Sequence, residues 1–215
     1  RGEFASYTTH MWREMRRLGV DLRLSTRAEA SMLNDMEFDF VVCATGTVSG
    51  APELEGVEMP HVMSAVDAIE LLPQDLGTVA IVGGGALGCY TALRLSFKAK
   101  SVHIFEKGRS LGKDLGRTSR WVIMKDLHER GVELHKNAEV KQITREYVVL
   151  AENIQKQLFS ADTVVLATEP YPRLRLVDKL RAKGIELEIV GSVERKMNLL
   201  ESVHRAFQFA SGLEL

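Results

Sequence analysis

The feature that most constrains the fold is a glycine-rich stretch, AIVGGGALG, at residues 80–88. Gly83, Gly85 and Gly88 have the G-x-G-x-x-G spacing. In that pattern the first glycine permits a tight turn, the second lets the backbone approach a pyrophosphate, and the third packs a helix closely on a strand. The apolar run before the glycines predicts a buried strand, and residues 86–100 predict a helix whose free amides and positive dipole end point at the phosphate. The sequence therefore predicts a dinucleotide-binding site.

The next predicted strand, SVHIFEKG at residues 101–108, ends on Glu106, whose carboxylate is placed to accept a hydrogen bond from a ribose hydroxyl. A carboxylate there repels a 2′-phosphate and favours NAD(H) over NADP(H). Lys107 and Arg109 follow closely, and either base can bind that phosphate, so NADP(H) stays an alternative cofactor. The residues expected to bind the dinucleotide are Gly83, Gly84, Gly85, Ala86, Leu87, Gly88 and Glu106.

Hydrophobic periodicity predicts further elements on both sides of this unit. After Glu106 the expected elements are a helix at 119–129, a strand at 132–140, an alternating pair within 141–162 and a buried strand at 163–170. Before the glycine loop they are a helix at 3–18, a short strand at 20–24, a strand buried on both faces at 38–46 and a connection at 47–73. After residue 171 they are a strand at 185–191 and a helix at 198–209.

Composition excludes several classes of partner. The chain has 28 Lys and Arg against 29 Asp and Glu, so no basic excess predicts a nucleic-acid partner. No apolar run is long enough for export or a membrane anchor, so we expect no membrane partner. Cys43 and Cys89 are far apart in apolar settings, which is typical of a reduced, cytoplasmic protein.

The remaining reactive residue types do not form a recognisable site in the sequence. The histidines show no i,i+4 pair and no metal-ligand spacing, so we expect no metal site; they are His10, His61, His103, His128, His135 and His204. No G-x-S-x-G elbow supports a hydrolase. Cys89 stands in the first turn of the loop helix, where a dipole can lower a thiol pKa, although a packed small apolar role is the simpler interpretation.

An ordered set of motifs resembles the paired FAD and NAD(P)H domains of the two-dinucleotide-binding flavoproteins. These motifs are VVCATG, APELEGV, VAIVGGGALG and ADTVVLAT. The stretches RGEF, GVDLRLST, SAVDAIELL and GKDLGRTSRWVIMKDLHERGVEL are similar to the C-terminal part of the 2-enoate reductases, 2,4-dienoyl-CoA reductases and trimethylamine dehydrogenase. The resemblance implies an α/β fold in which a Rossmann-like NAD(P)-binding domain, residues 75–168, is inserted into an incomplete FAD-binding domain made of 1–74 and 169–215.

In such proteins the nicotinamide passes hydride to FAD, so the resemblance implies an NADH:flavin oxidoreductase and no catalytic residue in this chain. It also implies that Ala44, Thr45, Gly46, Gly191 and Ser192 approach FAD. FMN, an iron–sulfur cluster and a flavin barrel are expected only in an N-terminal part of the same polypeptide, because two isolated cysteines cannot ligate such a cluster. The chain begins at Arg1, and we expect it to be a piece of a longer protein that is not active alone.

Three positions depart from the pattern that the resemblance implies. Tyr90 stands where an acidic residue often faces the nicotinamide, Glu169 where a turn would end in glycine, and Ser192 where an aspartate lies near the FAD. These departures leave a second interpretation open. In it the chain is a non-catalytic module that binds an adenine nucleotide or serves structure and interaction.

Overall fold

The computed structural model describes residues 2–33, 38–48, 50, 54–151, 157–195 and 197–213. Two compact units are present, one made of Arg1–Cys43 and Leu174–Glu188 and the other of Ala44–Arg173 and Ile189–Leu215. Arg1 of the RGEF motif and residues 51–53 of the APELEGV motif lie outside the described residues. The two units are described in turn.

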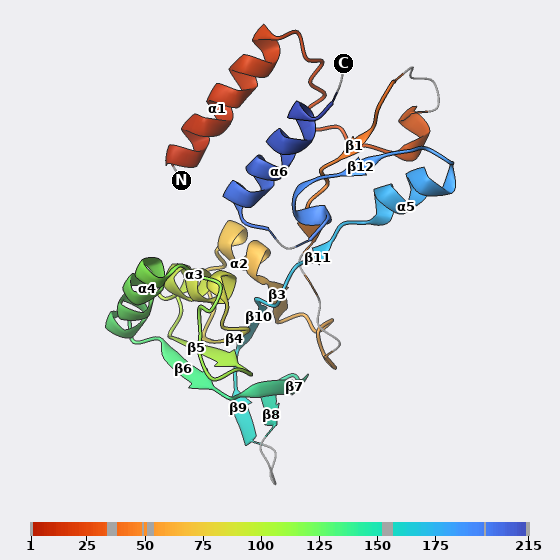
Figure 1. Cartoon of the computed structure of the whole chain (residues 1–215). Coiled ribbons are helices and arrows are strands. Elements are labelled where there is room, and N and C mark those ends of the chain that lie inside the picture. Colours follow the sequence, from red (N-terminus) through yellow and green to blue (C-terminus); the bar gives the residue numbers. More distant parts are fainter. Residues whose placement is uncertain are drawn as a thin grey trace. The chain divides into compact units, whose positions relative to one another are not determined.

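A five-stranded parallel sheet forms the centre of the larger unit, in the order β3-β10-β4-β5-β6 (Figure 1). Its strands are β3 (Val62–Ser64), β4 (Thr78–Val82), β5 (Ser101–Glu106), β6 (Glu133–Lys136) and β10 (Thr163–Leu166). Successive residues of β4 point to opposite faces, and four of its five residues are buried, as expected of a parallel strand covered on both sides. Strands β4, β5 and β10 confirm the strands predicted before the glycine loop, up to Glu106 and from residue 163.

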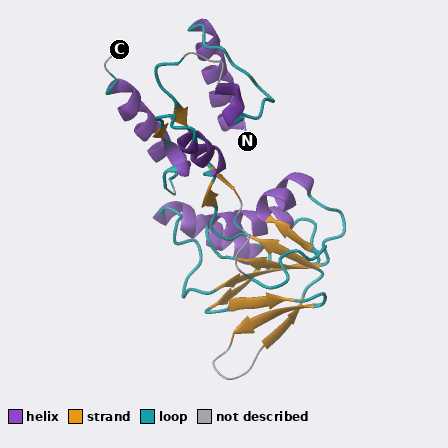
Figure 2. Ribbon diagram, turned by 90° about the vertical axis from the view of Figure 1, so that its right-hand side faces the viewer, coloured by secondary structure: helices purple, strands orange, loops and turns teal. Residues whose placement is uncertain are grey.

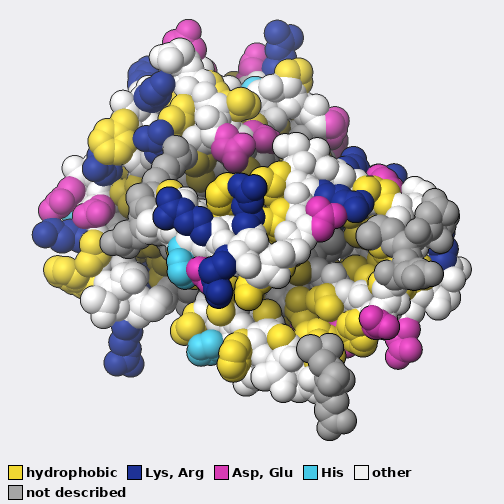
Figure 3. All heavy atoms as spheres, turned by 90° about the horizontal axis from the view of Figure 1, so that it is seen from above, with side chains coloured by type: hydrophobic (Ala, Val, Ile, Leu, Met, Phe, Trp, Pro, Cys, Tyr) yellow, Lys and Arg dark blue, Asp and Glu magenta, His cyan; other side chains and the backbone are white. Residues whose placement is uncertain are grey.

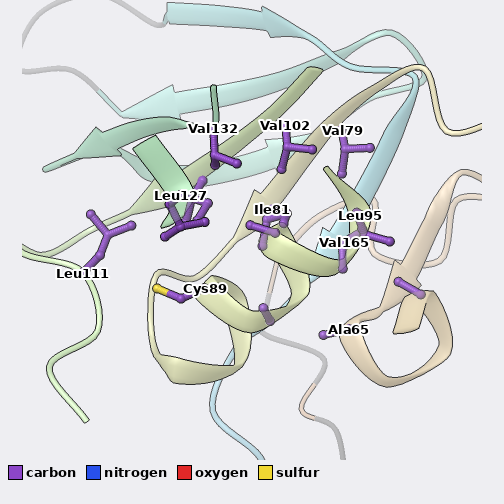
Figure 4. Packing of buried hydrophobic residues seen from close by; sticks show 14 of the residues in the cluster. Ala65, Val79, Ile81, Cys89, Leu95, Val102, Leu111, Leu127, Val132 and Val165 are labelled. Atoms are coloured by element: carbon purple, nitrogen blue, oxygen red, sulfur yellow. The ribbon is translucent and has the colours of Figure 1, made fainter. Parts of the chain in front are cut away.

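Each face of this sheet carries its own apolar core. Val79 and Ile81 of β4 pack with residues of α2 (Ala65–Leu71), α3 (Ala86–Leu95) and α4 (Arg117–Glu129), as Figure 4 shows. Ala80 and Val82, one residue out of phase, belong to the second core. That core includes residues of the antiparallel sheet formed by β7 (Glu139–Ile143), β8 (Tyr147–Ala151) and β9 (Gln157–Ser160), seen below the parallel sheet in Figure 2.

This arrangement is an α/β Rossmann-like fold, as the sequence predicted. Two details differ from prediction. Residues 47–73 are not a plain connection, because they contain β2 (Thr47–Val48), β3 and α2, and β3 pairs with β10 inside the sheet. The single strand predicted at 132–140 is instead β6 and β7, separated at Asn137, which has a positive φ of 53°.

The larger unit also contains a small strand pair and a C-terminal helix. β2 pairs antiparallel with β11 (Tyr171–Pro172), and the short helix η2 (Gly191–Val193) contacts β11. Helix α6 (Leu199–Ser211) confirms the helix predicted at 198–209. It begins at a capping box. The Asn198 side-chain oxygen accepts a hydrogen bond from the Glu201 backbone N–H, and the Glu201 carboxylate accepts one from the Asn198 backbone N–H.

The smaller unit contains α1 (Gly2–Arg17), η1 (Ala30–Leu33), β1 (Val42–Cys43) and α5 (Arg175–Ala182), and β1 pairs with β12 (Glu188–Ile189). Helix α1 confirms the helix predicted at 3–18. Residues 20–24 are not a strand, and β1 covers only two residues of the strand predicted at 38–46. Phe38 and Phe40 are exposed, so this segment is not buried on both faces. Helix α5, which buries Val177 and Leu180, was not predicted.

Charged side chains of both signs are interspersed on the face drawn in Figure 3. Among the described residues, no helix has both the length and the apolar character required to cross a bilayer.

Candidate functional site

The glycine loop joins β4 to α3, and backbone atoms leave no room for a Cβ at two of its glycines. Gly83 has a φ of +109°, its N–H donates to the Phe105 carbonyl oxygen at 2.9 Å, and a Cβ there would lie 2.6 Å from the Ala167 oxygen. A Cβ on Gly88, in the first turn of α3, would collide with the Gly83 carbonyl oxygen. These contacts match the roles expected for the first and third glycines.

Gly85 differs from these two because the fold itself tolerates a side chain there. It is the N-cap of α3 with an ordinary φ of −70°, and a Cβ would meet only the Asp114 carboxylate, at 3.4 Å. The absence of a side chain at Gly85 therefore leaves the first amides of α3 accessible to an acidic group. This is the position at which a backbone must approach a pyrophosphate.

Glu106 lies at the end of β5 and is bonded by two backbone amides. The Gly84 N–H donates to its Oε2 at 2.8 Å, and the Gly108 N–H donates to its Oε1 at 2.7 Å. The carboxylate thus joins the loop after β4 to the loop after β5. Each carboxylate oxygen has two lone pairs, so Glu106 keeps acceptor capacity for ribose hydroxyls.

An anion already occupies the N-terminus of α3. The Ala86 N–H, one of the helix amides that has no intrahelical partner, donates to Asp114 Oδ1 at 2.8 Å. The segment that carries Asp114 is fixed against the glycine loop because the Gly112 N–H donates to the Gly84 oxygen at 2.7 Å. Asp114 was not among the predicted site residues, since only the folding of the 108–116 loop brings it to the helix.

Cys89 is fully buried under the same loop, and its Sγ–H donates to the Gly84 oxygen at 3.6 Å. Burial, and after it the nearby Asp114 carboxylate, raises the pKa of this thiol from 9.0 to about 11. The helix dipole therefore does not produce a thiolate here. Cys89 has the packed apolar role that the sequence favoured.

A cavity of about 430 Å³ lies beside the loop that carries Asp114, and its lining includes Lys113, Arg117, Arg120 and Trp121. The guanidinium of Arg120 is held by its Nε–H, which donates to the Leu111 oxygen at 2.8 Å. Lys107 and Arg109, the two bases considered for a 2′-phosphate, are exposed. The cations that line this cavity, Lys113, Arg117 and Arg120, provide a favourable environment for phosphate groups.

The residues predicted to approach FAD lie around the β2–β11 pair. Thr45 donates through Oγ1 to the Arg173 oxygen at 3.0 Å, and the Arg173 N–H donates to the Gly46 oxygen at 2.9 Å. Gly46 has a φ of +67°, and a Cβ there would meet open space. Ala44 is exposed. Gly191 and Ser192 belong to η2, which contacts β11.

The three departures from the expected pattern occupy separate places. Tyr90 is half exposed on α3 and borders a groove of about 410 Å³ that also includes Ser119 and Val122 of α4. Glu169 is exposed between β10 and β11. The Ser192 hydroxyl donates to the Met197 oxygen at 3.2 Å.

The structure also brings together a group that sequence reasoning missed. His103 of β5 lies beside Glu133 and His135 of β6, with all three ligand atoms within 4.8 Å of one another. A signal was available, because Glu133 and His135 are two residues apart on a strand and so share one face. His103, which completes the group, lies on the neighbouring strand, and the spacing of residues along one strand does not predict which strand pairs with it.

Comparisons with known proteins identify the family of the chain. Residues 21–207 match the family described as pyridine nucleotide-disulphide oxidoreductase. The chain is 32% identical to a bilirubin reductase of Mediterraneibacter gnavus over 95% of the chain and 32% of that protein. It is 28% identical to an NADH oxidase of Thermoanaerobacter brockii over 92% of the chain and 31% of that protein.

A solved structure of 2-naphthoyl-CoA reductase superimposes with a TM-score of 0.83 at 23% identity, covering 93% of this chain and 30% of that one. This likeness shows a shared fold. The chain spans about a third of the length of the curated relatives it matches. With the family match extending over most of its residues, the chain belongs to the pyridine nucleotide-disulphide oxidoreductase family.

Proposed function

We propose that this chain is the pyridine-nucleotide-binding region of a multidomain NADH:flavin oxidoreductase of the enoate and dienoyl-CoA reductase type. When bound, NAD(P)H supplies a hydride and FAD accepts it. The observation that carries the proposal is the glycine turn between β4 and α3 together with Glu106 at the end of β5, whose carboxylate is held beside that turn by the Gly84 N–H. The family to which the chain belongs supports FAD and NAD(P)H as its cofactors.

The residues of the glycine loop have distinct roles in this proposal. Gly83 and Gly88 fix the turn and the helix, and Gly84, Gly85, Ala86 and Leu87 present backbone to the pyrophosphate. Glu106 accepts from the ribose hydroxyls while its two amide bonds hold it in place. Its negative charge supports NAD(H) over NADP(H).

The domain organisation extends the proposal. The nucleotide domain at 75–168 is inserted between two parts of an FAD-binding domain, 1–74 and 169–215. Ala44, Thr45, Gly46, Gly191 and Ser192 face the FAD. FMN, the iron–sulfur cluster and a flavin barrel belong to an N-terminal part of the same polypeptide, and we place the protein in the cytoplasm.

Replacing Gly85 tests the nucleotide site. A second glycine, Gly116, also stands at a helix N-cap and provides the matched control. Gly85 caps α3 and Gly116 caps α4, both have ordinary φ values, and neither is confined by backbone atoms. We expect Gly85→Val to abolish NADH binding in calorimetric titrations, while Gly116→Val leaves binding unchanged. Equal thermal stability of both variants would show that the loss is local.

The titration is repeated with NADPH, ADP and the Glu106→Ala variant. NADH binding that weakens in Glu106→Ala supports the nicotinamide site and the preference for NAD(H). NADH binding that survives Gly85→Val would contradict the proposal, because the ligand would then lie elsewhere.

A second candidate is a non-catalytic module, which the Asp114 carboxylate on the Ala86 amide favours. In that case the acid replaces the phosphate permanently, and Tyr90, Glu169 and Ser192 reflect a site that transfers no hydride. The same titration separates the two candidates, since this module binds ADP alone or no nucleotide.

A further inference from the structure

A second cluster of polar side chains lies on the sheet face opposite the helices. His103 of β5 is in register with Glu133 of the edge strand β6, and His135 follows Glu133 by two residues on the same face. Phe105 and Phe159 surround the two imidazoles within the core formed with β7–β9. The cluster therefore combines buried aromatic walls with three groups that can ligate a metal.

The two distances from His103 to the other ligand atoms match those around a small metal ion. His103 Nδ1 lies 3.2 Å from His135 Nε2 and 3.5 Å from Glu133 Oε2. Zinc binds imidazole nitrogen at about 2.0–2.1 Å and carboxylate oxygen at about 2.0–2.2 Å, so tetrahedral angles put neighbouring ligand atoms about 3.3–3.5 Å apart. Because all three atoms lie within 4.8 Å of one another and the Glu133 side chain is exposed, that side chain is free of packing that would prevent it from completing the site.

Hydrogen bonding on the far side of His103 suits the tautomer with the proton on Nε2. The Ser101 hydroxyl donates to Thr78 Oγ1 at 3.3 Å, which leaves the Ser101 oxygen to accept from His103 Nε2–H at 3.2 Å. With its proton on Nε2, His103 turns the Nδ1 lone pair toward Glu133 and His135. A lone pair that faces a carboxylate is stabilised by a cation between them. A second hydrogen bond of this kind is typical of histidines that ligate metals.

Packing holds the ligands in place and leaves one side open. Only 7% of His103 is exposed, its ring centroid lies 4.5 Å from that of Phe159, and the His135 ring stacks on Phe105 with centroids 4.5 Å apart. The Glu133 side chain is 64% exposed. The buried His103 and the half-buried His135 are thus preorganised, and solvent reaches the site from the Glu133 side.

We propose that His103, Glu133 and His135 bind a divalent transition-metal ion of the zinc class, with water as the fourth ligand. Two imidazoles and one carboxylate suit zinc and its neighbours better than Mg²⁺ or Ca²⁺, which prefer oxygen ligands. The ion would join β6, the edge of the parallel sheet, to β5. This inference does not depend on the proposed function, because it uses no residue of the nucleotide site.

The test is a calorimetric titration of the 215-residue chain with Zn²⁺, together with the visible absorption of Co²⁺ added in its place. We expect one tight site, a tetrahedral Co²⁺ spectrum and no competition from Mg²⁺. Glu133→Gln and His135→Ala change the less buried ligands, so these variants should fold. Each should weaken Zn²⁺ binding at least tenfold, since loss of outer-shell partners alone costs about 10–100-fold.

Matched controls are His128→Ala and Glu146→Gln, which alter exposed residues outside the cluster and should leave binding unchanged. Ser101→Ala should weaken binding by about tenfold through His103, without removing a ligand. Zn²⁺ affinity that is unchanged in both Glu133→Gln and His135→Ala would overturn the proposal, as would the absence of Zn²⁺ binding to the folded chain. Either result would identify the histidines as a hydrogen-bonded structural pair.

Discussion

Two carboxylates beside the glycine loop, those of Glu106 and Asp114, have different consequences for nucleotide binding. The Glu106 carboxylate accepts hydrogen bonds from the backbone N–H groups of Gly84 and Gly108 and lies partly buried at the end of β5. Asp114 is exposed and accepts from the Ala86 amide, at the position expected for a pyrophosphate. One acid therefore supports the expected nucleotide site, whereas the other competes with the ligand for the same helix amide.

We predict that Asp114→Asn tightens NADH binding. Asparagine still accepts the Ala86 N–H and caps α3, so the fold should be unaffected. Removing a like-charge repulsion of about 1 kcal/mol, the value for unit charges 4 Å apart in water, strengthens binding roughly fivefold. Calorimetric titration measures the change, and Asp75→Asn, at another exposed acid, is the control. Weaker binding in Asp114→Asn would instead identify Asp114 as a ligand-binding residue.

At the scale of elements, the packing of α3 on β4 is set by two glycines rather than by large side chains. Gly83 turns the chain with a positive φ, and Gly88 lies directly against the Gly83 carbonyl oxygen. Backbone contacts of this kind cannot relax by changing a rotamer. The helix position, and with it the direction of the first amides of α3, depends on the absence of a Cβ at residue 88.

We predict that Gly88→Ala destabilises the folded chain by about 2 kcal/mol, within the usual range for overpacking. The added methyl group must displace the Gly83 carbonyl group or move α3. Urea denaturation measures the free energy of unfolding. Gly116→Ala is the control, because a Cβ there meets no atom within 4 Å and should change stability little. An equal loss in both variants would indicate a general effect of removing glycine.

Several elements were predicted from sequence because their signals are local. The buried runs of β4, β5 and β10 and the helical periodicity of α1, α4 and α6 are all visible in short windows. The strand predicted at 20–24 was wrong because Val20 and Leu24 are exposed and no strand in the described part of the chain pairs with this segment. Alternation predicts a strand only where a neighbouring strand supplies the hydrogen bonds.

The candidate site was predicted in part for the same reason. The glycine spacing and Glu106 follow from one strand–turn–helix pattern. The two amides that bond Glu106, the position of Asp114 and the cluster around His103 arise from loop folding and strand register. Most of these contacts join residues more than 20 positions apart, and such contacts leave no periodic trace in a single sequence.

At the scale of the whole molecule, each compact unit contains one cysteine. Cys43 belongs to the smaller unit and Cys89 to the larger one. Burial raises the pKa of both thiols, so each is protonated and unreactive near neutral pH while its unit is folded. Among the described residues, the smaller unit buries few apolar side chains; they are Ala30, Cys43, Val177 and Leu180.

We predict that Cys43 becomes accessible to a thiol reagent at lower urea concentration than Cys89. The smaller unit buries less apolar surface and should open first. Pulsed alkylation across a urea series, followed by peptide mass analysis, measures the two midpoints separately. Cys43→Ser and Cys89→Ala variants assign each signal. Coincident midpoints would mean that the two units unfold as one cooperative body.

The pair of amides bonded to Glu106 also bears on how cofactor preference can evolve. Under the proposed function, the side chain that discriminates between NAD(H) and NADP(H) is the same one that ties the loop after β4 to the loop after β5. A single substitution toward NADP(H) would therefore release both loops before any new contact with the 2′-phosphate is gained. Descendants of this chain that change cofactor must first acquire another acceptor for the Gly84 and Gly108 amides, so the order of mutations is constrained.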